Sequence, residues 1–174
     1  MPATVSHPPL IVDGSDREFR ALVHDLIAFS NKLDACREAF AAIAGVSVIQ
    51  YEILMLLSRL APQGLAVGDV AGRLHRSTAF ITIESTKLVR RGLLEKLDDP
   101  EDGRRVRLCA TRKGDDLVKR LAPVQRQVND LLFACLDAGR FQLLRDLARD
   151  LAACGDRGAA FAQFLCDTVV REAA

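Results

Sequence analysis

The sequence predicts a mainly α-helical chain that contains one small β-hairpin. Hydrophobic residues make up 49% of its 174 residues but aromatic residues only 5%, and tryptophan is absent, so the core must be built from aliphatic side chains. Apolar residues recur at intervals of three and four along most of the chain. Residues 93–111 differ, because two strand-like runs there flank a charged turn with Pro100 and Gly103. The length suits one well-filled core.

Several classes of protein are disfavoured at this stage. No apolar stretch has the roughly 18–20 residues of a membrane span, and the N-terminus lacks the form of a signal peptide, so we expect a cytoplasmic protein. The five cysteines are widely spaced and form no C-x-x-C pair, which disfavours disulfides and zinc sites. We expect no metal and no cofactor.

The first long helix is predicted over residues 15–46. Residues 1–14 hold three prolines and are expected to form a flexible arm. Ser15 and Glu18 have the S-x-x-E form of a capping box, and an apolar stripe follows to about Gly45.

Three shorter helices are predicted next. Ser47 and Gln50 repeat the capping device before a helix that ends at residues 61–64. A helix of two or three turns follows, and its apolar face consists of Val67, Val70, Ala71 and Leu74. After a tight turn, Ser77 caps a helix that runs to Arg91 and is stopped by Gly92. Short hydroxyl residues make this last helix unusually slim, with Ile81 and Leu88 expected on its inner side.

The strands and the remaining helices complete the prediction. Residues 93–97 and 106–110 read as the two strands of the hairpin. Thr111 caps a long fifth helix in which Pro123 predicts a kink. Gly155 and Gly158 are expected to break the C-terminal part into a sixth and a seventh helix.

Charge is unevenly distributed along the chain. The net charge is +1, but residues 66–120 hold 13 Lys and Arg against 9 Asp and Glu, a net of +4, which leaves 11 against 14 elsewhere. A basic middle segment is a mild signature of nucleic-acid binding, although a solvated surface fits it equally well.

The order of short helix, tight turn, slim helix and hairpin is that of a winged helix-turn-helix. Gln50 and the runs VGDVAGRL, KLVRRGLL and DPEDGRRVRLCATRKG resemble the DNA-binding module of MarR-type transcription regulators, over roughly residues 20–135. The resemblance implies a DNA-binding lobe at 47–111, with dimerisation helices at 15–46 and 112–174. It also implies a homodimer on a pseudo-palindromic double-stranded DNA operator, and we expect a repressor released by a small anionic, often aromatic, effector.

The resemblance also implies DNA-contacting residues. At the hairpin tip, Asp102 holds an arginine of the pair Arg104 and Arg105, one of which enters the minor groove, and an acid near an arginine can indeed fix its direction. The slim helix would present to the major groove Ser77, Thr78, Ala79, Thr82, Ile83 and Thr86. Phosphate contacts are expected from Arg76, Lys87, Arg90 and Arg91, with an ordinary surface charge as the alternative at each. Glu84 has no assigned role.

For the effector, the resemblance points to a cleft between the dimerisation helices and the DNA-binding lobe. Residues on segments that could line it are His24, Phe29, Tyr51 and Arg59. Two rival functions stay open: a thiol-based redox regulator that uses Cys36, and a helical adaptor that no longer binds DNA. An enzyme is not expected, because the three histidines lie in unrelated contexts and no G-x-S-x-G, P-loop or H-E-x-x-H motif occurs.

Overall fold

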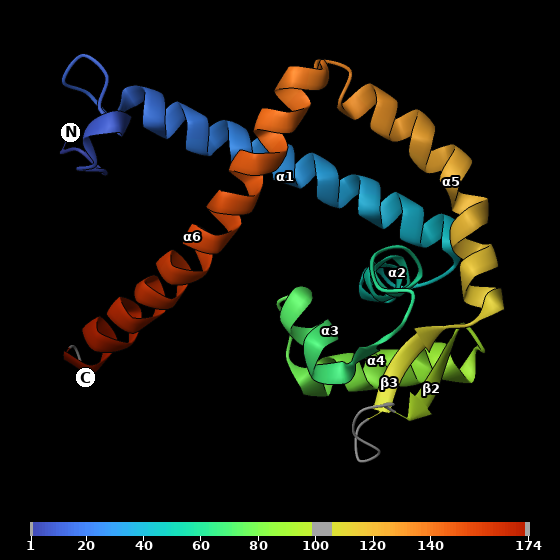
Figure 1. Cartoon of the computed structure of the whole chain (residues 1–174). Helices are drawn as coiled ribbons and strands as arrows, with labels where there is room; N and C mark the ends of the chain where they lie inside the picture. Colours follow the sequence, from blue (N-terminus) through green and yellow to red (C-terminus); the bar gives the residue numbers. More distant parts are fainter. Residues whose placement is uncertain (1, 99–105, 173–174) are drawn as a thin grey trace. The chain divides into compact units, whose positions relative to one another are not determined.

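The computed structural model describes residues 2–98 and 106–172, which form two compact units, 1–128 and 129–174. Figure 1 shows the elements along the chain. Those before the hairpin are a short 3-10 turn η1 (Pro8–Leu10), α1 (Arg17–Ala44), α2 (Val48–Met55), a π-helical turn η2 (Leu56–Leu60), β1 (Leu65–Ala66), α3 (Val67–Arg73) and α4 (Thr78–Arg90). The hairpin strands and the last helices are β2 (Leu94–Asp98), β3 (Val106–Ala110), α5 (Arg112–Leu132) and α6 (Ala138–Glu172).

The start of α1 differs from the predicted capping box. The N-cap residue is Asp16, and the Ser15 hydroxyl accepts a hydrogen bond only from the Arg17 backbone N–H, at 3.2 Å. The buried Asp16 carboxylate instead accepts from the backbone N–H and the hydroxyl of Thr4, at 2.7 and 2.8 Å. These two bonds, together with the Arg20 charge, lower the pKa of Asp16. The segment expected to be a flexible arm thus carries local structure that is tied to α1.

The start of α2 agrees with the prediction. The Ser47 hydroxyl accepts from the Gln50 backbone N–H, and the Gln50 side chain accepts from the Ser47 backbone N–H, which completes the capping box. Gly45, which ends α1, and Gly92, which follows α4, both have the left-handed backbone expected of helix-terminating glycines.

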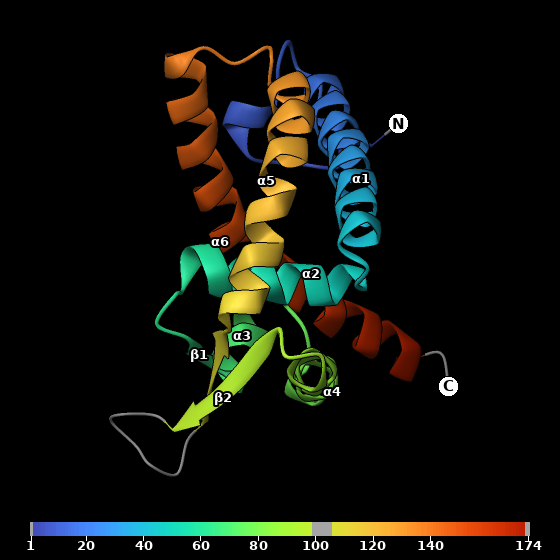
Figure 2. The same ribbon diagram turned by 90° about the vertical axis from the view of Figure 1, so that its right-hand side faces the viewer.

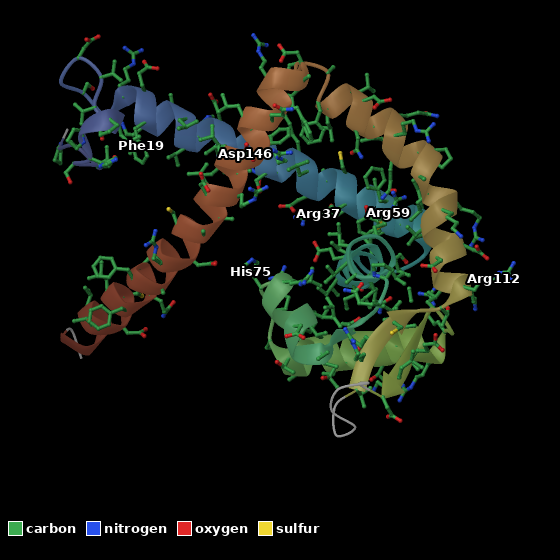
Figure 3. All side chains as sticks on the ribbon, viewed as in Figure 1. Phe19, Arg37, Arg59, His75, Arg112 and Asp146 are labelled. Atoms are coloured by element: carbon green, nitrogen blue, oxygen red, sulfur yellow. The ribbon has the colours of Figure 1, made fainter. Side chains whose placement is uncertain are left out.

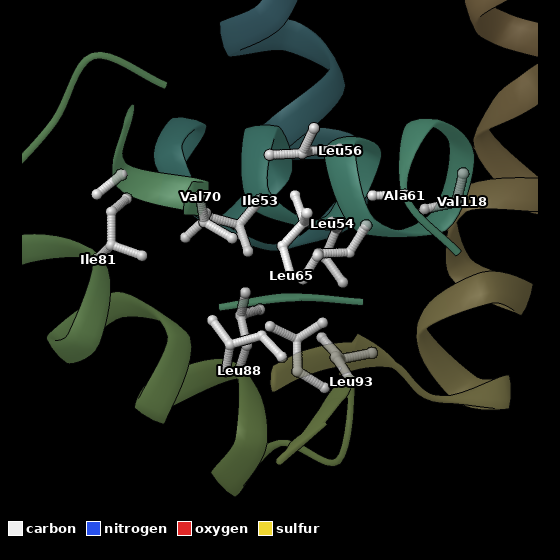
Figure 4. Packing of buried hydrophobic residues seen from close by; sticks show 14 residues of the cluster. Ile53, Leu54, Leu56, Ala61, Leu65, Val70, Ile81, Leu88, Leu93 and Val118 are labelled. Carbon is white, nitrogen blue, oxygen red and sulfur yellow. The ribbon is translucent and has the colours of Figure 1, made fainter. Parts of the chain in front are cut away.

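The main core joins α2, α3, α4 and the sheet (Figure 4). Ile53 and Leu57 from the α2–η2 segment meet Ile81 and Leu88 of α4, and all four side chains are fully buried. The inward placement predicted for Ile81 and Leu88 is therefore confirmed. A second cluster, made by Phe40, Ala41, Ala44, Tyr51 and Leu121, packs α1 and α5 against α2. The contacts of Ile81 and Leu88 in the main core fix the orientation of α4.

The predicted hairpin is confirmed for its two strands. β2 and β3 pair antiparallel, with Leu94 opposite Ala110 and Asp98 opposite Val106. β1, which the sequence analysis missed, pairs with the other edge of β3 and gives the order β1-β3-β2. Figure 2 shows β2 beside α4, seen along the helix axis. The hairpin tip, and with it Asp102, Arg104 and Arg105, lies outside the described residues.

The C-terminal helices confirm one prediction and correct another. The Thr111 hydroxyl accepts from the Gly114 backbone N–H at 3.1 Å, so it caps α5 as expected. The predicted break at Gly155 and Gly158 is wrong, because α6 runs through both residues to Glu172. A glycine inside a helix costs about 1 kcal/mol but keeps its backbone hydrogen bonds, so neighbouring helix formers can carry the helix through it.

None of the described helices is by itself long and apolar enough to cross a membrane. Only α1 together with the α2–η2 segment meets that criterion of length and composition, as a pair bent by 88°.

Candidate nucleic-acid interface and effector cavity

The helix-turn-helix is built from α3, α4 and a tight turn. His75 in this turn has a positive φ of 51°, which lets the chain reverse within a few residues. Ser77 then caps α4, since its hydroxyl accepts from the Phe80 backbone N–H at 3.3 Å. The first turn of α4 is therefore fixed by its own cap as well as by the core.

The outer face of α4 is the one that the sequence analysis assigned to DNA. Ile83 is 55% exposed although it is apolar, and Thr86 is half-buried. The other predicted contacts are exposed, namely Arg76, Ser77, Thr78, Ala79, Thr82, Lys87 and Arg90. The structure thus brings the predicted helix residues together along one element, with the core on the opposite side.

Two of the three threonine hydroxyls on this face, those of Thr82 and Thr86, already donate hydrogen bonds within the helix. Thr82 Oγ1 donates to the Thr78 carbonyl at 2.8 Å, and Thr86 Oγ1 donates to the Thr82 carbonyl at 2.7 Å. Each oxygen keeps its lone pairs, and each side chain keeps a methyl group. In this state the face accepts hydrogen bonds and offers apolar contacts, which suits base amino groups and thymine methyls in a major groove.

Glu84 acquires a role that the sequence did not reveal. Glu84 is 6% exposed, and its carboxylate lies between two donors, Gln50 Nε2 of α2 at 2.7 Å and Lys87 Nζ of α4 at 2.6 Å. The Lys87 bond, and after it the Gln50 bond, hold the pKa of Glu84 below its ordinary value of 4.5 against the opposing effect of burial. Glu84 therefore ties the middle of α4 to α2 and sets the angle at which α4 presents its outer face.

The four cations expected near phosphate have different surroundings. Lys87 forms an ion pair with Glu84 at 2.6 Å, while Arg90 forms no ion pair or hydrogen bond with the described residues. Arg91 is used inside the fold, because its Nη1 donates to the Gly45 carbonyl at 2.9 Å. Arg76, at the turn before α4, is exposed and borders a cavity.

That cavity has a volume of about 610 Å³ and contains two of the four predicted effector residues, Tyr51 and Arg59. His24 lies on an exposed part of α1, with its Nδ1 3.6 Å from an Asp25 oxygen, and neither it nor Phe29 lines the cavity. Residues that were not predicted to bind the effector complete the wall, namely Arg37, Glu52, Met55, Leu56, Leu60, Arg73, Leu74, His75 and Arg76. Figure 3 labels Arg37 of α1, Arg59 of η2 and His75 of the α3–α4 turn.

The cavity is lined by charged and polar side chains as well as apolar ones. The Arg37 guanidinium pairs with Asp34 and, at 2.8 Å, with Glu52, and so connects α1 to α2. The Tyr51 hydroxyl accepts from Gln125 Nε2 of α5 at 2.7 Å, and burial raises its pKa above 10.0. Glu52 is the single acid on the wall, against four arginines.

The cysteines and the possible metal ligands of the described residues do not form a further site. Cys36 is half-buried beside the second core cluster, and Cys109 is buried in β3, where burial raises the pKa of its thiol. Among residues 2–98 and 106–172, no three His, Cys, Asp or Glu side chains gather as a metal site would require.

Comparison with known proteins points to one family. A model of the MarR family matches residues 46–106. The HTH-type transcriptional regulator YhbI of Bacillus subtilis, described as uncharacterised, is 27% identical over 106 residues, which are 61% of this chain and 68% of YhbI.

Two solved structures share the fold. NadR in complex with 4-hydroxyphenylacetate has a TM-score of 0.65 and 24% identity, and the match covers 87% of this chain and 98% of NadR. The MarR family regulator Sco3205 from Streptomyces coelicolor, in complex with DNA, has a TM-score of 0.68 and 19% identity, covering 78% and 90% of the two chains. The family match spans α2 to the first residue of β3, which is the helix-turn-helix with its first hairpin strand. Residues 46–106 of this chain therefore match the MarR family of transcription regulators, and they fold as a winged helix-turn-helix.

Proposed function

We propose that the protein is a homodimeric repressor, without catalytic activity, that binds a pseudo-palindromic double-stranded DNA site in the cytoplasm and leaves it when a small anionic aromatic molecule binds. The exposed face of α4 carries this proposal. It is slim, accepts hydrogen bonds, and is held at a fixed angle by Glu84 beside the paired strands β2 and β3. Sco3205, which shares the fold, is a regulator seen in complex with DNA.

The proposed contacts with DNA differ between side chains according to their chemistry. Thr78, Thr82 and Ile83 meet base edges, while Arg76, Lys87 and Arg90 contact phosphates and set the register. For the hairpin tip, the proposal keeps what the family resemblance implies: Asp102 holds an arginine of the pair Arg104 and Arg105, and one of this pair enters the minor groove. Because α4 has few charged groups to offer the bases, the arginines supply most of the affinity.

A dimer is supported by apolar side chains left exposed on the long helices. Leu22, Leu26 and Ile27 of α1 are each about half exposed, and α6 exposes Phe141, Leu144, Leu147, Leu151, Phe161, Phe164, Leu165 and Val169. Apolar faces of this length are characteristic of protein interfaces. Two-fold symmetry then places two copies of α4 on two half-sites.

The effector is proposed to bind in the 610 Å³ cavity. Four arginines and one acid favour an anion, and Tyr51, Met55, Leu56 and Leu60 favour an apolar or aromatic body. NadR, which shares the fold, holds 4-hydroxyphenylacetate, an aromatic acid.

Release from DNA follows from the position of the cavity. Its wall includes Leu74, His75 and Arg76 of the turn that leads into α4. An anion that draws Arg76 inward removes it from a DNA phosphate, and a body packed against Leu74 shifts the start of α4. An effector that binds the altered turn more tightly than the DNA-binding form lowers the affinity for DNA. The limit of this decrease is the ratio of the effector's affinities for the two forms.

A selection experiment followed by titration tests the function. Duplexes bound by the protein are selected from a random pool, and their affinity is measured by fluorescence anisotropy with and without 4-hydroxyphenylacetate and related aromatic acids. The selected site should be an inverted repeat, and one of the acids should release it. Arg59→Gln should bind the same duplex but need about tenfold more acid, since a charged hydrogen bond contributes about 1.5–3 kcal/mol. Arg17→Gln, exposed and away from the cavity, is the control. Failure to enrich any duplex would refute the proposal.

A further inference from the structure

We infer a second anion site, for a small phosphorylated molecule, in a hollow where the end of α1, the end of α4 and the start of α5 meet. Its volume is about 490 Å³, within the range of about 300–1,000 Å³ typical of ligand clefts. Its lining residues are Ala44, Arg90, Arg91, Leu93, Lys113, Leu117 and Arg120. None of them belongs to the effector cavity described above.

Four of the seven lining residues are cations and none is an acid. Lys113, Leu117 and Arg120 stand at positions i, i+4 and i+7 of α5, which places them on one face of that helix. Arg90 and Arg91 end α4 opposite this face. Cations gathered at one place repel one another, so an anion with several negative oxygens gains from all four.

Two of these cations are already held in place. Arg91 Nη1 donates to the Gly45 carbonyl at 2.9 Å, and Lys113 Nζ donates to the Arg91 carbonyl at 2.7 Å. Each keeps further N–H groups for a ligand. Because these groups are fixed before binding, little conformational entropy is lost when an anion arrives. Arg90 and Arg120 form no ion pair or hydrogen bond with the described residues.

The apolar floor of the hollow increases the attraction between these cations and a bound anion. Ala44 and Leu93 are buried, and Leu117 is half-buried. An apolar floor keeps water from one side and raises the electrostatic attraction above its value in open solvent. A phosphate group has several oxygens, so it can bind an arginine through two N–H groups and a lysine ammonium at the same time. A mixed set of arginine and lysine therefore suits a phosphorylated ligand.

A DNA backbone phosphate has the same chemistry, but the shape of the site favours a free molecule. The hollow is a recess that three helices border and that stays open to solvent on one side, whereas a duplex presents a broad convex surface. Arg90 and Arg91 are the lining residues for which the sequence analysis expects contact with a DNA phosphate, so the test leaves both unchanged.

The test uses inorganic pyrophosphate as the probe, titrated by calorimetry into the full-length protein at constant ionic strength. Arg120→Glu places a negative charge in the hollow and should weaken pyrophosphate binding at least about tenfold. The control is Arg126→Glu, which makes the same charge change on an exposed position of α5 outside the hollow. Circular dichroism checks that both variants remain folded.

A parallel titration with a duplex of arbitrary sequence separates the two phosphate sources. Loss of pyrophosphate affinity in Arg120→Glu alone, with duplex affinity equal to that of the control, supports the site. Equal pyrophosphate affinity in both variants, no binding to the original protein, or a matching loss for the duplex overturns it.

Discussion

Gln50 of α2 and Glu84 of α4 are joined by a buried hydrogen bond of 2.7 Å between Nε2 and Oε2. Gln50 also closes the capping box at the start of α2. One side chain therefore fixes the start of α2 and, through Glu84, the helix proposed to enter DNA.

Glu84→Gln should destabilise the protein by about 1–3 kcal/mol at pH 7, because the amide has one acceptor oxygen for the two donors Gln50 and Lys87, and its NH2 group then faces a donor. The folded-state pKa of Glu84 is lowered, so its contribution is present above about 4.5 and is lost as the pH falls through the folded value. The difference between variant and original should therefore shrink below pH 4.5. Urea unfolding at several pH values measures it, with the exposed Glu38→Gln as control. A difference that stays constant to pH 3 would contradict the assignment.

Gly64→Ala should destabilise the base of the hairpin. Gly64 has a φ of +79°, and an added Cβ would collide with Cys109 Sγ and lie 2.8 Å from the Leu108 carbonyl oxygen. Strain of both kinds together costs about 2–4 kcal/mol. Gly68→Ala in α3 is the matched control, because nothing lies within 4 Å of its added Cβ, and it should stabilise the helix by about 0.5–1 kcal/mol. Thermal unfolding of both variants measures these changes as shifts of the midpoint temperature. An unchanged midpoint for Gly64→Ala would contradict the prediction.

Much of the fold could be predicted because its signals are local. The Ser47–Gln50 box, the Ser77 cap and the alternation in β3 each involve neighbours in sequence. The failures have non-local or weakly coded causes. At the start of α1, the Asp16 carboxylate accepts hydrogen bonds from Thr4, 12 residues earlier, and does not cap its own helix. β1 has only two residues, too few for a period-two pattern.

The sites were predicted less completely for the same reason. The exposed face of α4 follows from its own periodicity, but the partner of Glu84 lies 34 residues away. The effector cavity draws on α1, α2, η2, α3 and the turn after it, so Arg37 and His75 could be assigned only once these segments were folded together. Tyr51 and Arg59, which were predicted to bind the effector, lie on one short helical segment and both line this cavity.

Arg76→Gln should weaken DNA binding in a manner that depends on salt rather than on sequence. Each phosphate contact contributes about 0.9 to the slope of log K against log salt, so loss of one contact per protomer should reduce the slope by about two. Anisotropy titrations at several salt concentrations give this slope. Arg126→Gln, an exposed position on α5, is the control. An unchanged slope would remove Arg76 from the interface, and a protein whose affinity for DNA is independent of salt would favour the adaptor function.

Leu147→Glu should dissociate the proposed dimer without unfolding α6. Leu147 is 49% exposed, and Leu144 and Leu151 stand one turn to either side of it on the same apolar face. A charge in the centre of such a face loses the burial of one leucine, worth about 1.5–3 kcal/mol per protomer, and must also be desolvated. Glutamate is a good helix former, so the helical content should not change. Sedimentation velocity should show a monomer, and affinity for an inverted-repeat site should fall because each half-site is then bound separately. Gln142→Glu introduces the same charge on the opposite side of α6 and should remain dimeric. If Leu147→Glu sediments as a dimer, α6 does not provide the interface.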